Sequence, residues 1–340
     1  MNCVVLSLKS GVKPVRDLGF VRDMLAARLP DGDRICGIDP ITTGFSNETY
    51  VVQGLDLILR LPPSGGAMLD GRGVVEQARI YQQLATSDKA PPVPRIVDCC
   101  EDAGVIGVPF FVMERVAGES IHDIAMQSWF TDAPAPERTR MCTDWVAAIA
   151  SLARLPPLAV LGPAITPEED LRNWSAFASA ADCPVVVEAI ERLLKVPAPR
   201  SGKPAVIHGD PKLSNLMWED RAITAVLDWE MALNGEPLSD LAYMLYGFES
   251  DFHPATRAQQ LSGMLSRDEV IVLWSKVSGR PVEGLLWHEI AQFAKLCSIL
   301  AEGVNMFRTG RSTDPKLAYF QKNLDNWIGV TNAMLDAGGF

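Results

Sequence analysis

The chain has 340 residues, a formal net charge of −11 and a pI of about 4.9. This length favours about two domains or lobes over a single simple core. Because no cluster of Lys and Arg offsets the acidic charge, a nucleic-acid partner is disfavoured. The sequence contains no run of about 18 apolar residues, so no membrane span is predicted.

Hydrophobic periodicity in the first third of the chain predicts a small β-rich unit with one principal helix. The expected elements are a helix over Phe20–Leu29, strands over Ile35–Thr43, Glu48–Gln53 and Leu57–Leu61, the principal helix over Val74–Ala85, and strands over Arg95–Cys99 and Val105–Val116. We expect the first three strands to form an antiparallel meander. The segment Pro62–Gly73 is rich in Pro and Gly and is predicted to be an irregular connection.

The rest of the chain is predicted to be mainly helical, apart from strand hairpins within residues 206–246. The expected helices are Glu137–Leu155, Glu168–Ala181, Pro184–Lys195, Arg267–Gly279, Leu285–Arg308 and Asp314–Asp336. No internal repeat or low-complexity tract interrupts them.

Seven cysteines are scattered along the chain, and their number is odd. No CxxC pair suggests a metal or redox site, so we expect reduced thiols and a cytoplasmic protein. The apolar run in the first eleven residues, MNCVVLSLKSG, is too short for the core of a signal peptide. The sequence leaves the oligomeric state open.

Residues 206–246 carry two short polar loops, each preceded by an apolar run that is typical of a strand. The candidate site residues here are His208, Asp210, Lys212, Asn215 and Asp228. Taken singly, each has an ordinary explanation as a turn residue, a helix cap or a buried histidine. Together, two carboxylates and an amide in this order are what metal-dependent phosphoryl transfer requires. We predict that Asp210 accepts a proton from a substrate hydroxyl, while Asn215 and Asp228 hold Mg²⁺ against the phosphates of ATP.

The stretch VIHGDPKLSNLMWEDRAITAVLDWEMALNGEPLSDLAY resembles the catalytic and metal loops of the aminoglycoside phosphotransferase family, which shares the protein-kinase-like fold. HGD stands where protein kinases have HRD, and DWE stands where they have DFG. The resemblance implies an α+β protein with a small, β-rich, nucleotide-binding N-lobe over residues 1–117 and a large, mainly helical C-lobe over residues 118–340. It implies ATP and Mg²⁺ as cofactors. The implied catalytic residues are Asp210, Lys212, Asn215 and Asp228.

The resemblance also points to four nucleotide-binding residues in the smaller lobe: Ser46, Asn47, Arg60 and Glu76. Ser46 and Asn47 lie in a turn similar to one that folds over phosphates in the family, although a plain hairpin turn would have the same composition. Arg60 stands where kinases place a lysine, and Glu76 opens the following helix. This pair would grip the α- and β-phosphates; the alternative is an ordinary surface ion pair.

Four further positions are assigned by the same resemblance. Glu114 and Val116 mark the hinge between the lobes, where adenine would meet the backbone. Lys212 lies two residues after Asp210 and would either neutralise the transferred phosphoryl group or face solvent. Asp240, in PLSDLAY, is expected to be structural, either capping the following helix or bonding to the catalytic loop.

Within the family, the runs AVLDWEMALNGEPLSDLAY, LILRLPP and FAKLCSILAEGVNMFRTGR resemble kinase-like proteins found beside, or fused to, acyl-CoA dehydrogenases. This branch implies a small-molecule acceptor, the hydroxyl of a hydroxyacyl-CoA. Arg308, Arg311 and Lys316 would then contact a CoA phosphate, or else be solvated helix-end charges. Two alternatives stay open: phosphorylation of an aminoglycoside antibiotic, and a pseudo-enzyme that binds nucleotide without turnover.

Overall fold

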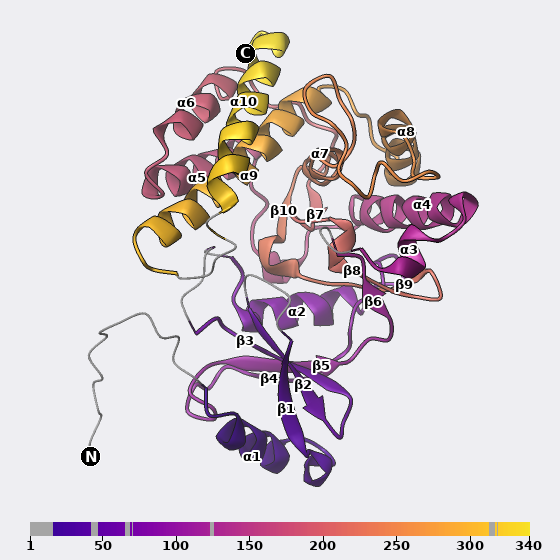
Figure 1. Cartoon of the computed structure of the whole chain (residues 1–340), viewed down its shortest axis with the longest axis vertical. Coiled ribbons are helices and arrows are strands. Elements are labelled where there is room, and N and C mark those ends of the chain that lie inside the picture. Colours follow the sequence, from indigo (N-terminus) through magenta and orange to yellow (C-terminus); the bar gives the residue numbers. More distant parts are fainter. Residues whose placement is uncertain are drawn as a thin grey trace.

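A computed structural model of the protein describes residues 16–41, 47–64, 69, 71–122, 126–312, 317 and 319–340. Within these ranges a β-rich lobe carries the N-terminal third of the chain, and a larger helical lobe carries the rest (Figure 1). The α+β, two-lobed architecture that the sequence predicts is therefore confirmed.

The smaller lobe is built on an antiparallel sheet of five strands in the order β1-β2-β3-β5-β4. Its elements are α1 (Leu18–Arg28), the 3₁₀ turn η1 (Gly32–Arg34), β1 (Gly37–Ile41), β2 (Glu48–Gln53), β3 (Leu57–Leu61), α2 (Val74–Leu84), β4 (Ile96–Cys100) and β5 (Phe110–Glu114). The predicted meander is present, since β2 pairs with both β1 and β3. The strand predicted over Val105–Val116 is shorter because the chain turns at Gly107, whose φ is +88°.

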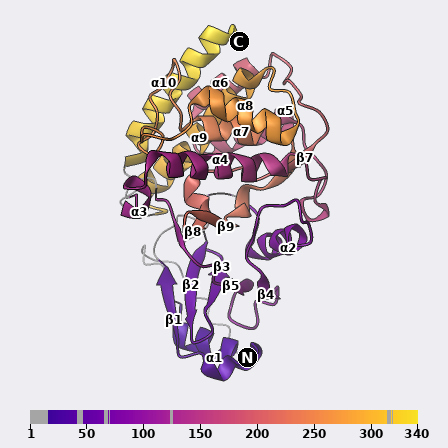
Figure 2. The ribbon, with the colours of Figure 1, turned by 90° about the vertical axis from the view of Figure 1, so that its right-hand side faces the viewer.

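The two faces of this sheet pack against different helices, as the alternation of side chains along a strand dictates. Leu59 of β3 joins the cluster that contains Leu25 of α1. Its neighbour Ile58 belongs instead to the large cluster that contains Tyr81 of α2 and continues into the helical lobe. Figure 2 shows α1 at the far end of the molecule and α2 beside the helical lobe. The principal helix therefore connects the sheet to the second lobe.

The larger lobe is mainly helical, as predicted. Its helices are α3 (Ser128–Thr131), α4 (Ala135–Leu152), α5 (Pro167–Ala180), α6 (Pro184–Leu193), α7 (Leu238–Leu245), α8 (Arg267–Ser278), α9 (Leu285–Arg308) and α10 (Phe320–Gly338), with 3₁₀ turns η2 (Ala159–Leu161), η3 (Leu213–Asn215) and η4 (Trp229–Met231). The starts of α5 and α8 are fixed by capping boxes, in which Thr166 pairs with Glu169 and Ser266 pairs with Glu269. The predicted helix start at Asp314 lies outside the described residues.

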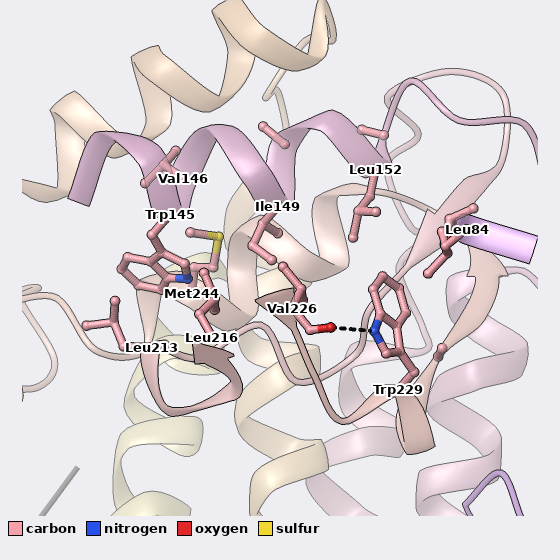
Figure 3. Packing of buried hydrophobic residues seen from close by; sticks show 14 of the residues in the cluster. Leu84, Trp145, Val146, Ile149, Leu152, Leu213, Leu216, Val226, Trp229 and Met244 are labelled. Atoms are coloured by element: carbon pink, nitrogen blue, oxygen red, sulfur yellow. Dashed lines mark hydrogen bonds between the residues drawn. The ribbon is translucent and has the colours of Figure 1, made fainter. Parts of the chain in front are cut away.

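Two small sheets position the polar loops of the helical lobe. β7 (Ala205–Ile207) pairs antiparallel with β10 (Leu233–Gly235), and β8 (Leu216–Glu219) lies between β6 (Glu119–Ser120) and β9 (Ala222–Val226). Figure 3 shows Trp145 and Ile149 of α4 packed near Leu213, Val226 and Trp229. Because the interior is close-packed, the loops that follow β7 and β9 rest on a rigid base.

Candidate active site

The loop after β7 brings three of the predicted catalytic residues into contact. Asp210 is 8% exposed. The Asn215 amide donates from Nδ2 to the Asp210 backbone oxygen and to Oδ2, each at 2.8 Å. Lys212 Nζ lies 3.0 Å from the same Oδ2. Asn215 reaches back because the turn η3 reverses the chain between the two residues.

The charge state of Asp210 follows from these neighbours. Burial alone would raise the pKa of this carboxyl, but the Lys212 cation and a hydrogen bond from Tyr243 outweigh burial and lower the pKa to about 2. Asp210 is therefore ionised at neutral pH. Its other oxygen, Oδ1, is buried and has no hydrogen-bond partner in the part of the chain that the structure describes. A carboxylate oxygen of this kind can accept a hydrogen bond from a ligand.

The loop after β9 places Asp228 in a left-handed backbone conformation, with φ +66°. Aspartate tolerates this region better than most residues, and such outliers concentrate at functional sites. The Asp228 backbone N–H donates to the Tyr81 hydroxyl of α2 at 3.1 Å, and Arg60 Nη2 lies 3.7 Å from Asp228 Oδ1. This carboxylate therefore faces the smaller lobe.

Direct contacts connect the two loops. The Leu227 N–H donates to the Asn215 oxygen at 2.8 Å, and His208 Nε2 lies 2.9 Å from the Leu227 oxygen. The His208 ring also packs against Trp229, with ring centroids 4.6 Å apart. His208 is fully buried and is a structural bridge between the loops. The sequence picks out His208 among the candidate site residues, and the structure shows that it connects the two loops.

Asp240, at the start of α7, is hydrogen-bonded to the loop after β7, which is the predicted catalytic loop. Its carboxylate accepts hydrogen bonds from the backbone N–H groups of His208 and Gly209, at 2.8 and 2.9 Å. The residue is 3% exposed. Of the two structural roles expected for Asp240, the bond to the loop is confirmed.

The donor set for a metal consists of one carboxylate and one amide. In the described ranges there is no group of three or more His, Cys, Asp or Glu side chains that could hold a metal ion. Asn215 and Asp228 nevertheless fit Mg²⁺, because this ion keeps several waters and takes oxygen ligands from one or two side chains plus substrate phosphates. Asp228 Oδ1 also has no hydrogen-bond partner among the described residues.

The predicted partners Arg60 and Glu76 are not brought together. Arg60 Nη1 donates to Thr49 Oγ1 at 2.6 Å, and its other contact is with Asp228. Glu76 is exposed on the first turn of α2, and no ion pair joins it to Arg60 in the described structure. Tyr81 of α2 contacts the metal loop instead, and so does the N–H of Arg72, two residues before α2, which donates to the Glu230 oxygen at 2.7 Å.

The other residues predicted to bind nucleotide lie on two segments of the smaller lobe. Asn47, just before β2, has its Nδ2 3.5 Å from Glu230 Oε2, so the start of β2 approaches the metal loop; Ser46 lies outside the described residues. The Glu114 side chain pairs with Arg95 and its N–H donates to the Arg95 oxygen. The Val116 N–H, by contrast, makes no backbone hydrogen bond in the described structure.

A cavity of about 380 Å³ opens at the N-terminal end of α2. Asn47, Glu76 and Glu230 line it, together with residues of the connection between β3 and α2 and of the β4–β5 hairpin. Neither Asp210 nor Asp228 does. The cavity therefore adjoins the metal loop through Glu230.

Sequence reasoning missed three residues that complete the site. Tyr81 supports the metal loop, Tyr243 bonds to Asp210, and Lys295 of α9 donates from Nζ to the Gly209 oxygen at 2.5 Å. A signal for Lys295 was present, because a single lysine within the apolar run of α9 is unusual. Neither tyrosine stands out from a core aromatic in one sequence.

The fold and this site together define a kinase-like phosphotransferase architecture, with a β-rich lobe placed over an Asp–Asn loop and a second acidic loop. Residues 37–273 match the model of the phosphotransferase enzyme family known as APH. The chain belongs to this family.

Comparisons with individual proteins agree with this assignment. The chain is 30% identical over 226 residues to acyl-CoA dehydrogenase family member 10 of Mus musculus, an alignment that covers 62% of this chain and 20% of that relative. The match is thus to a small part of a much longer protein. A Ralstonia eutropha JMP134 structure assigned to the aminoglycoside phosphotransferases has a TM-score of 0.74 at 20% identity, covering 95% of this chain and 99% of that one.

A second solved structure shows the same fold at lower identity. It is the GDP complex of aminoglycoside 2'-phosphotransferase-IIIa, with a TM-score of 0.61 and 14% identity over 92% of this chain and 99% of that one. None of the described helices is both long and apolar enough to cross a membrane.

Proposed function

We propose that the protein transfers the γ-phosphoryl group of ATP to a hydroxyl of a small molecule, with Mg²⁺ as the metal. The observation that carries the proposal is the Asp210 carboxylate, which is ionised and buried, with Oδ2 held by Asn215 and Lys212 while Oδ1 has no hydrogen-bond partner among the described residues. Family membership supports the reaction class, and the bound GDP of one structural neighbour supports a nucleotide donor.

Asp210 and Lys212 would have different roles in the proposed reaction. Asp210 Oδ1 would accept the hydrogen bond of the acceptor hydroxyl and take its proton as the new P–O bond forms and ADP leaves. A pKa of about 2 makes Asp210 a weak base, so its main contribution is orientation, with proton transfer late in a loose transition state. Lys212 would offset the negative charge of the transferred group.

The nucleotide is held from both lobes in this proposal. Mg²⁺, when bound, neutralises phosphate charge, and Asn215 and Asp228 are the residues that would hold it. Arg60 would replace the usual lysine, since it already lies 3.7 Å from Asp228 and a guanidinium stays charged at all physiological pH values. Glu76 is exposed and forms no ion pair with Arg60 in the described structure, so Arg60 would act here without it.

For the acceptor we favour a hydroxyacyl-CoA. The mouse relative's name, acyl-CoA dehydrogenase family member 10, supports this choice, and so does the sequence resemblance to that branch. Arg308 and Arg311 stay candidates for the CoA phosphates: they pair with Asp182 and Glu302 at 3.1 and 2.8 Å and remain largely exposed. Lys316 lies outside the described residues.

The test is an ADP-release assay on the purified protein with MgATP and a panel of 3- and 4-hydroxyacyl-CoAs, aminoglycosides, choline and simple sugars. We expect turnover with hydroxyacyl-CoAs alone, and its loss in Asp210→Asn, which retains the shape of the side chain. Turnover on aminoglycosides alone would leave the phosphotransferase proposal standing and reject the acceptor. Binding of MgATP without turnover of any acceptor would favour the pseudo-enzyme.

A further inference from the structure

The peptide unit that leads into Asp210 is held at both of its polar ends. The Asp210 N–H donates to His208 Nδ1 at 3.2 Å, and the Gly209 oxygen accepts from Lys295 Nζ at 2.5 Å. Since the direction of the Cα–Cβ bond follows from the peptide planes that flank Cα, these two contacts limit where the Asp210 side chain begins and which positions its carboxylate can reach. One of them comes from a residue 86 positions further along the chain.

Gly209 itself leaves the loop little freedom. Its φ is +84°, and a Cβ at this position would lie 2.4 Å from the Met231 oxygen. Its N–H donates to Asp240. The glycine thus allows a close approach of the two loops, while Asp240 holds its donor and Lys295 holds its acceptor.

Lys295 has surroundings that favour a fixed ammonium group. It is 4% exposed, and its Nζ lies 5.4 Å from the Trp174 ring centroid and 5.1 Å from that of Tyr243, within the range of cation–π attraction. Burial lowers its pKa, while the carboxylates of Asp170, Asp210 and Asp240 act in the opposite direction. A buried lysine with carboxylates and two aromatic faces around it is held in one place, unlike a lysine in solvent.

We propose that Lys295 is a positioning residue, which reaches from α9 to hold the Gly209 carbonyl and thereby fixes the direction of the Asp210 carboxylate. Its effect on catalysis rests on the function proposed above, whereas its effect on the loop does not. Lys295 also joins three helices at this point, because Trp174 lies on α5 and Tyr243 on α7.

The test compares Lys295→Met with Cys297→Ala. Both residues are buried on α9, but Cys297 contacts Thr331 of α10 instead of the catalytic loop. Hydrogen exchange is followed in peptides that cover residues 206–216, and in peptides that cover residues 48–61 of the smaller lobe as a reference. The values of kcat and of KM for MgATP are measured with any acceptor found in the panel. We expect faster exchange over 206–216 only in Lys295→Met, with kcat lower by about 10²-fold and KM for MgATP little changed, because misplacement of a catalytic group acts on kcat.

Two results would overturn the proposal: wild-type exchange over 206–216 in Lys295→Met, or equally increased exchange there in Cys297→Ala, which would indicate general loosening of α9. If Lys295→Met does not fold, Lys295→Gln takes its place, since it retains a hydrogen-bond donor without the charge. If no acceptor is turned over, the proposed function fails while the exchange experiment still decides the role of Lys295.

Discussion

Replacing Asp240 with asparagine tests how the catalytic loop is held. In the structure the carboxylate accepts two backbone hydrogen bonds, from His208 and Gly209, at a position 3% exposed. An amide offers one acceptor oxygen, so Asp240→Asn leaves one buried N–H facing an NH₂ group. A buried donor without a partner costs about 1–3 kcal/mol.

A second effect partly offsets this cost. Burial raises the pKa of Asp240, so removing its charge relieves part of the desolvation penalty of the folded state. We expect a net loss of about 2 kcal/mol in the free energy of unfolding, a fall of roughly 30-fold in the folding equilibrium constant.

The measurement is equilibrium unfolding in urea, followed by Trp fluorescence and compared with Asp268→Asn, an exposed aspartate on α8. The control is expected within about 0.5 kcal/mol of the wild type. If Asp240→Asn unfolds at the same urea concentration as this control, the two hydrogen bonds do not hold the loop and the reasoning is wrong.

Three further predictions concern the other side chains of the site. The pKa of Asp210 in the folded state is lowered to about 2, so its ionised form stabilises the fold at pH values above the pKa of Asp in the unfolded state. This stabilisation is lost as the pH falls toward 2, and acid unfolding of Asp210→Asn should lack this component. Tyr81→Phe removes the acceptor of the Asp228 N–H and should weaken MgADP binding by about 1 kcal/mol in calorimetry, and unchanged affinity would argue against this support. Arg60→Lys should retain turnover and Arg60→Met should lose it, and equal kcat/KM values for both would show that no cation is needed there.

The sequence was sufficient for the parts of the site that are local. Asp210, Asn215 and the strands around them lie within one short stretch, where hydrophobic pattern and spacing determine the geometry. The placement of Asp240 against the loop was also expected, although a helix cap was the equal alternative. A few residues and one family resemblance are enough to predict these contacts.

The parts that sequence could not supply depend on tertiary packing. The Arg60–Glu76 pair was inferred from a family arrangement, yet the rotation of α2 is set by buried residues such as Tyr81, which one sequence does not reveal. Lys295 lies 86 residues after Gly209, and no local rule connects the two. Side chains that meet across helices are determined by how ridges and grooves interlock, so they become visible only in three dimensions.

The ion pair between Arg60 and Asp228 affects which form of the nucleotide can bind under the proposed function. At 3.7 Å and partly exposed, the pair contributes about 0–1 kcal/mol and is easily separated. Under the proposed function, a metal–nucleotide complex would bring a cation for Asp228 and an anion for Arg60, so both charges would gain new partners together. Nucleotide without metal would satisfy Arg60 alone and set its phosphates against an uncompensated carboxylate. This interlobe pair would therefore favour metal-bound over metal-free nucleotide before any chemistry begins.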